Sequence, residues 1–412
     1  MKAVQNLDSL AIIRRAEVQL AGRFAELEET AYLNQIKVLK AFQGEKIRDN
    51  HFSPSSGYGY GDIGRDALEA VYARVFETED ALVRSGIASG THAISNCLMA
   101  LLRSGDSLLS IAGSPYDTLG RVIGKSGATK GTLIDRGISY AEVPLDAEGK
   151  PDLEKIAQTI GPATTMVLIQ RSRGYSLRPA LSIAQLDEMC QVVRERNPQT
   201  LIMLDNCYGE FTETNEPGKL VDIMAGSLIK NPGGGLATGG GYICGRADLV
   251  EQAAWQLTAP GLGKELGSNP AGHRSYYQGL FLAPHVVLQA LKGAILMAHV
   301  FEEMGYAVLP KWNELRPDIV QVLQLKNESE VLRFCQVVQS SSPVDSDLRL
   351  EFAPMPGYED RVVMAAGTFV QGSSIELSCD APCREPYSVY IQGGLTYEHC
   401  RYVACKLVEE LC

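Results

Sequence analysis

The sequence predicts an α/β protein, with a large domain built on a mainly parallel sheet and a smaller α+β domain after it. From about residue 80 to residue 290, short apolar segments alternate with helical patterns, which is typical of a parallel sheet covered by helices. This alternation stops after about residue 300, and a length of 412 residues exceeds one typical domain. We therefore expect an N-terminal helical segment at 1–50, a large domain at 51–295 and a C-terminal domain at 296–412.

The elements follow in order along the chain. Residues 1–45 place apolar side chains at helical spacing, and a Gly/Ser/Tyr-rich loop at 50–69 leads into a helix that begins near Arg65. The predicted strands of the large domain are 80–86, 107–113, 165–171, 200–206, 226–230 and 241–245. The mixed apolar segments of the C-terminal domain are 331–339, 349–356, 361–370 and 373–379.

Composition narrows the class of protein. The formal net charge of −11 and the lack of a basic run argue against nucleic-acid binding. No apolar run approaches the roughly 18 residues that span a bilayer, so we expect no membrane partner. The ten cysteines show no metal-ligand spacing and the six histidines are dispersed, so we predict no metal site. Such scattered cysteines are typical of reduced thiols, and we expect a cytoplasmic location.

Three predicted strand ends carry polar side chains. Ser89, Gly90 and Thr91 begin a helix, where free N–H groups favour a phosphate, although an ordinary N-cap uses the same residues. Asp205 ends the apolar segment LIMLD, and Lys230 ends GSLIK, directly before a proline and a run of glycines. Ligands of parallel sheets bind at this edge, so we expect these side chains to lie close together.

Together these residues indicate pyridoxal 5′-phosphate. This cofactor needs a lysine for a Schiff base, here Lys230, and a carboxylate at the pyridine nitrogen, here Asp205. Tyr116 can supply an aromatic ring over the pyridine, and Ser227 a further phosphate contact. We expect Lys230 to take the α-proton of an amino acid, which requires its pKa to fall below the ordinary value, and Tyr116 to protonate the leaving group.

The chain resembles the methionine γ-lyase-like, or aluminium-resistance, proteins within the cystathionine γ-lyase branch of fold type I enzymes. The stretches that carry this resemblance are GYGYGDIGRDALE, SGTHAI, GSPYDTL, LDNCYGEF, GSLIKNPGGG and REPYSVYIQGGLTYEH. It spans nearly the whole chain. The resemblance implies the fold type I transferase fold, a covalent aldimine of pyridoxal phosphate on Lys230, and a homotetramer whose active sites are shared within a dimer.

The resemblance also implies site residues from other segments. A tyrosine and an arginine near the N-terminus reach the phosphate in the neighbouring subunit, and Tyr60 and Arg65 match this region, with Tyr58 as an alternative. An arginine of the C-terminal domain holds the substrate carboxylate, and Arg384 resembles it.

Two positions depart from the family's pattern. Arg171 and Arg173 stand where many fold type I enzymes have an asparagine, and they are alternatives to Arg384 for the carboxylate. Ile229 replaces the hydroxyl residue that usually precedes the lysine. Residues 261–278 are expected to line the pocket, with Lys264, His273 and Arg274 as further candidates.

The function expected from these residues is a carbon–sulfur lyase. It would act on a sulfur-containing amino acid by β- or γ-elimination and release a thiol, ammonia and a 2-oxo acid. An aminotransferase uses the same lysine, aspartate and phosphate loop, and a non-catalytic pyridoxal-phosphate-binding or metal-tolerance protein is a further alternative. A cysteine desulfurase or decarboxylase typically has histidines at positions 229 and 116, so Ile229 and Tyr116 argue against both.

Overall fold

A seven-stranded sheet forms the centre of the large domain. The computed structural model describes residues 2–125, 130–355, 358 and 360–411. The strand order is β1 (Asp80–Arg84), β7 (Gly241–Gly245), β6 (Ile223–Ser227), β5 (Leu201–Asp205), β4 (Met166–Gln170), β2 (Ser107–Ser110) and β3 (Ser139–Glu142). Only β7 pairs antiparallel with its neighbours, so the predicted mainly parallel sheet is confirmed. Strands β5 and β6 end at the same edge of this sheet.

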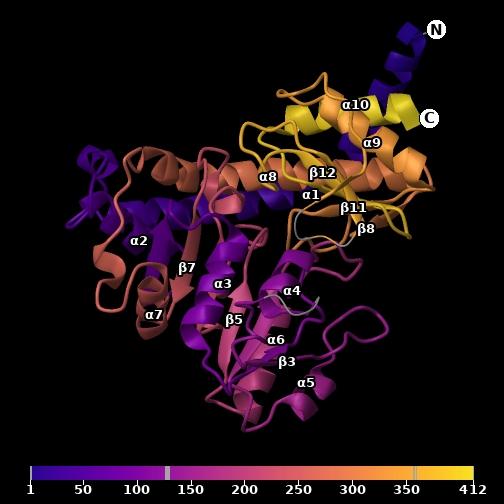
Figure 1. The fold of residues 1–412 in the computed structure, drawn as a ribbon. Helices are drawn as coiled ribbons and strands as arrows, with labels where there is room; N and C mark the ends of the chain where they lie inside the picture. Colours follow the sequence, from indigo (N-terminus) through magenta and orange to yellow (C-terminus); the bar gives the residue numbers. More distant parts are fainter. Residues whose placement is uncertain (1, 126–129, 356–357, 359, 412) are drawn as a thin grey trace.

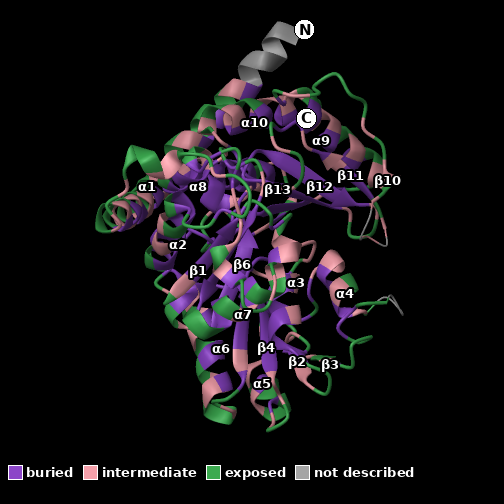
Figure 2. Cartoon of the chain, turned by 60° about the vertical axis from the view of Figure 1, so that its left-hand side comes forward, coloured by how far each residue is buried: buried purple, intermediate pink, exposed green. Residues whose placement is uncertain are grey.

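Helices cover both faces of this sheet, and the strands lie buried between them (Figure 2). These helices are α2 (Ile63–Val75), α3 (Gly90–Leu101), α4 (Asp117–Ile123), α5 (Leu153–Thr159), α6 (Ile183–Arg196) and α7 (Ala247–Leu257). Apart from β3, these strands are buried along nearly their whole length, because side chains on both of their faces pack against helices. Strand β3 was not predicted, since SYAE is half exposed and carries no apolar run.

Two long helices, α1 (Lys2–Gly44) and α8 (Arg274–Glu303), pack side by side along the top of the large domain (Figure 1). The predicted N-terminal helix is thus observed, whereas the predicted domain boundary at residues 295–296 falls inside α8. Among the described residues, α8 is the one helix long and apolar enough to cross a membrane. However, 72% of its most apolar stretch is buried within the protein, as in a core helix.

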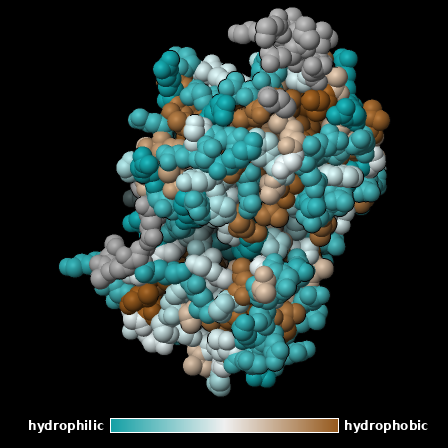
Figure 3. Space-filling model, turned by 90° about the vertical axis from the view of Figure 1, so that its right-hand side faces the viewer, coloured by the Kyte–Doolittle hydropathy of each residue, from teal (hydrophilic) through white to brown (hydrophobic). Residues whose placement is uncertain are grey.

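The C-terminal domain is an antiparallel six-stranded sheet backed by two helices. Its strand order is β10 (Ala353–Pro354), β11 (Arg361–Ala365), β12 (Ser378–Pro382), β13 (Ser388–Gln392), β9 (Gln321–Gln324) and β8 (Ala307–Leu309). Its helices are α9 (Glu328–Ser340) and α10 (Tyr397–Leu411). The surface is hollowed between this domain and the large domain (Figure 3). The register pairs Asp380 with Tyr390, so both side chains lie on one face of the sheet.

Candidate active site

Lys230 lies just beyond the sheet edge. Strand β6 ends at Ser227, three residues earlier than GSLIK suggested, and the Lys230 N–H donates to the Ser227 carbonyl at 3.4 Å. A short 3₁₀ turn at Asn231–Gly233 follows. Lys230 therefore projects from a turn rather than from a strand, and its side chain is only partly buried.

The glycines after Lys230 have a packing role. Gly234 adopts φ +52°, and a Cβ there would lie 2.2 Å from the Gly279 carbonyl of α8. A Cβ at Gly233 would lie 1.7 Å from the Leu228 carbonyl. Because only glycine tolerates both the left-handed backbone and such contact, this run lets α8 approach and hold the lysine turn.

Asp205 ends β5, next to β6, and its side chain is 4% exposed. The Cys207 N–H donates to its Oδ1 at 3.1 Å. Burial raises the pKa of Asp205, and the positive charge of Lys230 opposes this rise. The predicted proximity of the lysine and the buried carboxylate is therefore observed.

Sequence reasoning missed Tyr208. The Lys230 Nζ lies 3.8 Å from the centre of the Tyr208 ring, a distance at which a cation is attracted to an aromatic face. Tyr208 adopts φ +69°, which is costly for a side chain of this size and is typical of functional sites. The available signal was its place three residues after Asp205 in LDNCYGEF.

Tyr116 lies at the same edge, as the N-cap of α4. Its hydroxyl is 2.9 Å from Thr91 Oγ1, and its N–H donates to Gln170 Oε1 at 2.9 Å. Burial and the nearby Asp205 and Cys207 raise the pKa of Tyr116. Its hydroxyl therefore keeps its proton at neutral pH.

The start of α3 faces Ser227. Ser89 is the N-cap, and its Oγ accepts the His92 N–H at 3.1 Å, so the ordinary N-cap interpretation is confirmed. A Cβ at Gly90 would lie 3.1 Å from Cys207 Sγ and 3.3 Å from Ser227 Cβ. The helix N-terminus and Ser227 thus form one cradle, in which free N–H groups and a hydroxyl can meet an anion.

The Lys230 amine differs from the sequence-based expectation. Burial lowers its pKa, but the neighbouring Cys207, Tyr208, Asp205 and Tyr116 outweigh burial and raise the pKa well above the ordinary value. In this structure the Lys230 amine is therefore protonated at neutral pH, and it would have to lose that proton before it could act as a base.

Arg171 is held in the protein interior. It is fully buried, and its guanidinium donates to Asn206 Oδ1 at 2.9 Å and to Glu213 Oε1 at 2.9 Å. These contacts give it a structural role, so we do not assign it to the substrate.

The other two arginines differ from Arg171 in their contacts and from each other in burial. Arg173 is buried beside Asp318, with 3.8 Å between Nε and Oδ2. The side chain of Arg384 is 43% exposed, pairs with Asp360 at 2.8 Å, and donates to the Tyr175 carbonyl at 3.2 Å. Both arginines lower the pKa of Tyr390, which burial raises. They remain candidates for the substrate carboxylate.

Tyr60 and Arg65 differ sharply in burial. Tyr58 and Tyr60 are 71% and 63% exposed, with ring centres 5.6 Å apart. Arg65 is 2% exposed and donates to the carbonyls of Gly59 at 2.9 Å and Glu265 at 3.3 Å. Arg65 thus links the loop that carries Tyr58 and Tyr60, called the tyrosine loop below, to residues 265–267 of the same chain. Contact with a neighbouring subunit stays a prediction for all three residues.

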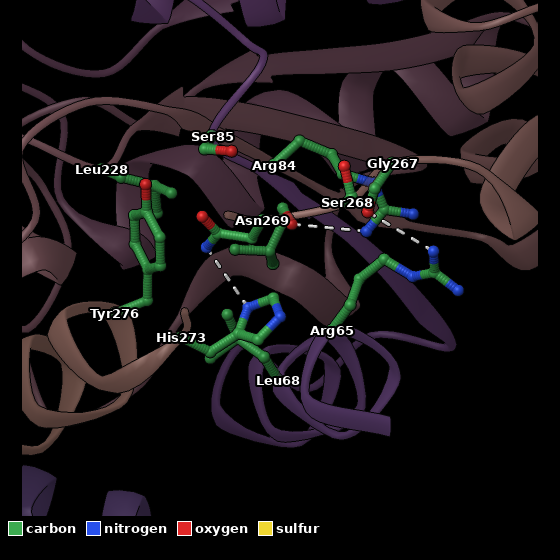
Figure 4. A pocket seen from close by; sticks show the side chains of 11 residues that line it. Arg65, Leu68, Arg84, Ser85, Leu228, Gly267, Ser268, Asn269, His273 and Tyr276 are labelled. Carbon is green, nitrogen blue, oxygen red and sulfur yellow. Dashed lines mark hydrogen bonds between the residues drawn. The ribbon is translucent and has the colours of Figure 1, made fainter. Parts of the chain in front are cut away.

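Arg65 also lines a small pocket beside the lysine turn (Figure 4). His273 and Leu228 line the same pocket, and His273 lies 3.0 Å from the Asp62 carboxylate. Lys264 pairs with Asp80 at 2.5 Å, and Arg274 lies over the Phe52 ring at 5.1 Å. The candidates from loop 261–278 therefore support the tyrosine loop and the first strand.

A second missed residue, Asp380, comes from β12 of the C-terminal domain. It is 2% exposed. Burial raises its pKa to about 6, and hydrogen bonds from Tyr175 and Ser373 and the positive charge of Lys230 oppose this rise. The Ile375 N–H donates to the Ile229 carbonyl at 3.0 Å, so the segment before β12 pairs with the lysine turn. The site is therefore built by both domains.

Comparisons with known proteins agree with this geometry. The family model for methionine gamma-lyase matches residues 9–412. The protein YnbB of Bacillus subtilis is 48% identical over 397 residues, covering 96% of this chain and 94% of its own. A structure from Listeria monocytogenes named "putative cystathionine beta-lyase involved in aluminum resistance" superposes with a TM-score of 0.95 at 48% identity, covering 98% of this chain and all of that one. MetB from Corynebacterium glutamicum, at 15% identity and a TM-score of 0.59, covers 84% of this chain and 85% of its own and shares the fold. This fold is that of the fold type I pyridoxal-phosphate enzymes.

Proposed function

Because the chain belongs to the methionine γ-lyase family, whose members depend on pyridoxal phosphate, we propose that it cleaves a carbon–sulfur bond of an amino acid by elimination. The products would be a thiol, ammonia and a 2-oxo acid. The observation that carries this proposal is the meeting of Lys230 and the buried Asp205 at one sheet edge.

The residues present fit the cofactor. Lys230 would hold its aldehyde, Asp205 its pyridine nitrogen, and the cradle of Ser89, Gly90 and Ser227 its phosphate. Glycine at position 90 lets the start of α3 lie close to Ser227, since a Cβ there would lie 3.1 Å from Cys207 Sγ and 3.3 Å from Ser227 Cβ. When bound, pyridoxal phosphate supplies an electron sink for the α-carbon of the amino acid.

The chain supplies the remaining chemistry. Lys230 Nζ would move the α-proton once it has lost its own proton, and Asp205 would stay ionised opposite a positive ring nitrogen. Tyr116 keeps its phenolic proton, so its Oη is suited to protonate a departing thiolate. Arg384 or Arg173 would orient the substrate carboxylate by a bidentate contact.

The test is an activity assay on the purified protein loaded with pyridoxal phosphate. L-Cystathionine, L-cysteine and L-methionine are added in turn, and thiol, ammonia and 2-oxo acid are measured. We expect all three products from at least one substrate, and no covalent cofactor band or turnover from Lys230→Ala. A change of the cofactor's absorbance without thiol release would indicate an aminotransferase instead. A bound cofactor that never turns over would indicate a carrier.

We also propose that two copies of the chain share their active sites, within a cytoplasmic homotetramer. The exposed Tyr58 and Tyr60 support this, because adjacent exposed aromatic rings favour an interface. The free thiols of all nine cysteines in the described residues support the location. Tyr60→Ala and Lys230→Ala should each be inactive, and mixing them should restore activity if the sites are shared between subunits. A mixture that stays inactive would contradict shared sites.

A further inference from the structure

Gln170 is a buried polar residue that the proposed chemistry does not use. It ends β4, is 6% exposed, and is registered opposite Asp205 of β5. Paired residues of neighbouring strands place their side chains on the same face of the sheet, so Gln170 and Asp205 lie side by side at the sheet edge. A buried amide group must satisfy both its oxygen and its nitrogen, and the partners of these two atoms show what Gln170 holds.

The amide oxygen of Gln170 holds the backbone of Tyr116. The Tyr116 N–H donates to Gln170 Oε1 at 2.9 Å. At the other end of the same residue, the Tyr116 hydroxyl lies 2.9 Å from Thr91 Oγ1 at the start of α3. Tyr116 is thus fixed at two points, by Gln170 at its backbone and by Thr91 at its hydroxyl.

The amide nitrogen and the following loop fix Gln170 itself. Gln170 Nε2 donates to the Ser172 carbonyl at 2.9 Å. The buried Arg178 donates to the carbonyls of Gln170, at 2.7 Å, and of Ser172. Gly174 adopts φ +59°, and a Cβ there would lie 3.0 Å from Gln170 Nε2 and 3.5 Å from Tyr116 Cβ. A flipped amide would point a donor at the Tyr116 N–H and an acceptor at a carbonyl, so only one orientation of the amide satisfies both contacts.

We propose that Gln170 is a positioning residue, which sets where the phenolic Oη of Tyr116 meets the sulfur of the substrate. This inference rests on the proposed function and deepens it, because it names the residue on which protonation of the leaving group depends. In that step the carbon–sulfur bond breaks with its electron pair on sulfur, and the Tyr116 O–H passes its proton to that sulfur. Gln170 acts on this step through Tyr116.

Two S-substituted cysteines of similar size separate this role from a general structural one. S-Benzyl-L-cysteine releases a basic alkyl thiolate that needs the proton, whereas S-(4-nitrophenyl)-L-cysteine releases a far less basic aryl thiolate that leaves without it. Gln170→Met keeps the side-chain volume and removes both polar ends. In protein loaded with pyridoxal phosphate, it should lower kcat/KM about thirtyfold for the benzyl compound and about threefold or less for the nitrophenyl compound, because a displaced acid slows only the step that uses it.

Controls test whether Gln170 acts through Tyr116. Gln191→Met makes the same change at an exposed position of α6 and should keep wild-type values. Tyr116→Phe should show the same dependence on the leaving group as Gln170→Met. Adding Gln170→Met to Tyr116→Phe should change the ratio of the two substrates by about twofold or less, because effects of residues that act as one unit do not add.

Two results would overturn the proposal. One is an equal loss for both substrates in Gln170→Met, and the other is a fully additive loss in the double variant. Gln170→Asn gives the same test if Gln170→Met does not fold, since its shorter amide stays polar but does not reach the Tyr116 N–H.

The proposed function can fail separately. If the wild type does not cleave both compounds, the position of Tyr116 is measured by cofactor binding. Pyridoxal phosphate is titrated into the cofactor-free protein, and its absorbance band gives the Kd. Gln170→Met should raise this Kd about fivefold in the otherwise wild-type chain, but not in a chain that carries Tyr116→Ala, where no ring is left to position. An unchanged Kd, or the same rise in both chains, would overturn the role of Gln170 without any turnover.

Discussion

The ammonium group of Lys230 lies 3.8 Å from the centre of the Tyr208 ring, and the two residues come from neighbouring strand ends. The backbone of Tyr208 is left-handed, at φ +69°, which costs about 1–3 kcal/mol for a non-glycine residue. This conformation accompanies the placement of the ring against the lysine.

Replacing Tyr208 tests whether the ring positions Lys230. Tyr208→Leu should lower kcat about tenfold, because a partly buried cation–π contact is worth about 1–2 kcal/mol. Tyr208→Phe keeps the ring and should stay close to wild type. The measurement is kcat together with the rate at which the cofactor-free protein gains its absorbance band. Equal losses in the two variants would argue that the hydroxyl, not the ring, matters.

Arg384 is the arginine whose loss should affect substrate binding. Arg384→Ala should raise KM about tenfold with a smaller change in kcat, because a charge-assisted carboxylate contact is worth about 1.5–3 kcal/mol. Asp360→Asn is the matched control, since it releases Arg384 from its ion pair and should not raise KM. Arg171→Met should instead destabilise the fold by about 3–5 kcal/mol, as expected for a broken buried pair. An unchanged KM in Arg384→Ala would move the assignment to Arg173.

The glycine run offers two positions with opposite expectations. Gly234→Ala should lower the free energy of unfolding by about 3 kcal/mol, because its Cβ would meet the Gly279 carbonyl in a left-handed backbone. Gly239→Ala, with nothing within 4 Å of its Cβ, should be near neutral. The measurement is urea unfolding of both variants. Similar unfolding midpoints would show that α8 does not require a glycine at position 234 for its close approach.

Glu210 should make stability depend on pH. It is fully buried and accepts the Tyr242 hydroxyl at 2.7 Å, and burial raises its pKa from 4.5 to about 8. Between these values the native protein holds a proton that the unfolded chain releases. Its contribution to stability therefore falls by about 1.4 kcal/mol per pH unit as pH rises through this window, and stays constant above about 8.

Glu210→Gln should remove this part of the slope and stabilise the protein most near pH 8. The exposed Glu195→Gln is the control and should leave the slope unchanged. Urea unfolding at about pH 5 and about pH 8 measures both. A wild-type slope retained in Glu210→Gln would assign the pH dependence to another group.

The sequence by itself determined the fold class and the centre of the site. The apolar runs of the parallel strands, and the polar residues that end them, are local patterns, and local patterns survive without a structure. Asp205, Lys230, Tyr116 and the start of α3 could therefore be placed at one sheet edge. The end of β6 was predicted three residues too late. Leu228 and Ile229 continue the apolar pattern of GSLIK, but they lie beyond the last paired residue of the strand.

Only the tertiary structure decided which charges meet. Arg171 and Arg65 looked like ligands, but long-range contacts to Glu213 and to residues 265–267 use their guanidinium groups. Asp380 lies 150 residues after Lys230 in the sequence, and no local sequence pattern predicts that the two side chains lie in the same region of the structure. The sheet of the C-terminal domain brings them together, because the register and the packing of the two domains fix which face of β12 turns toward the lysine.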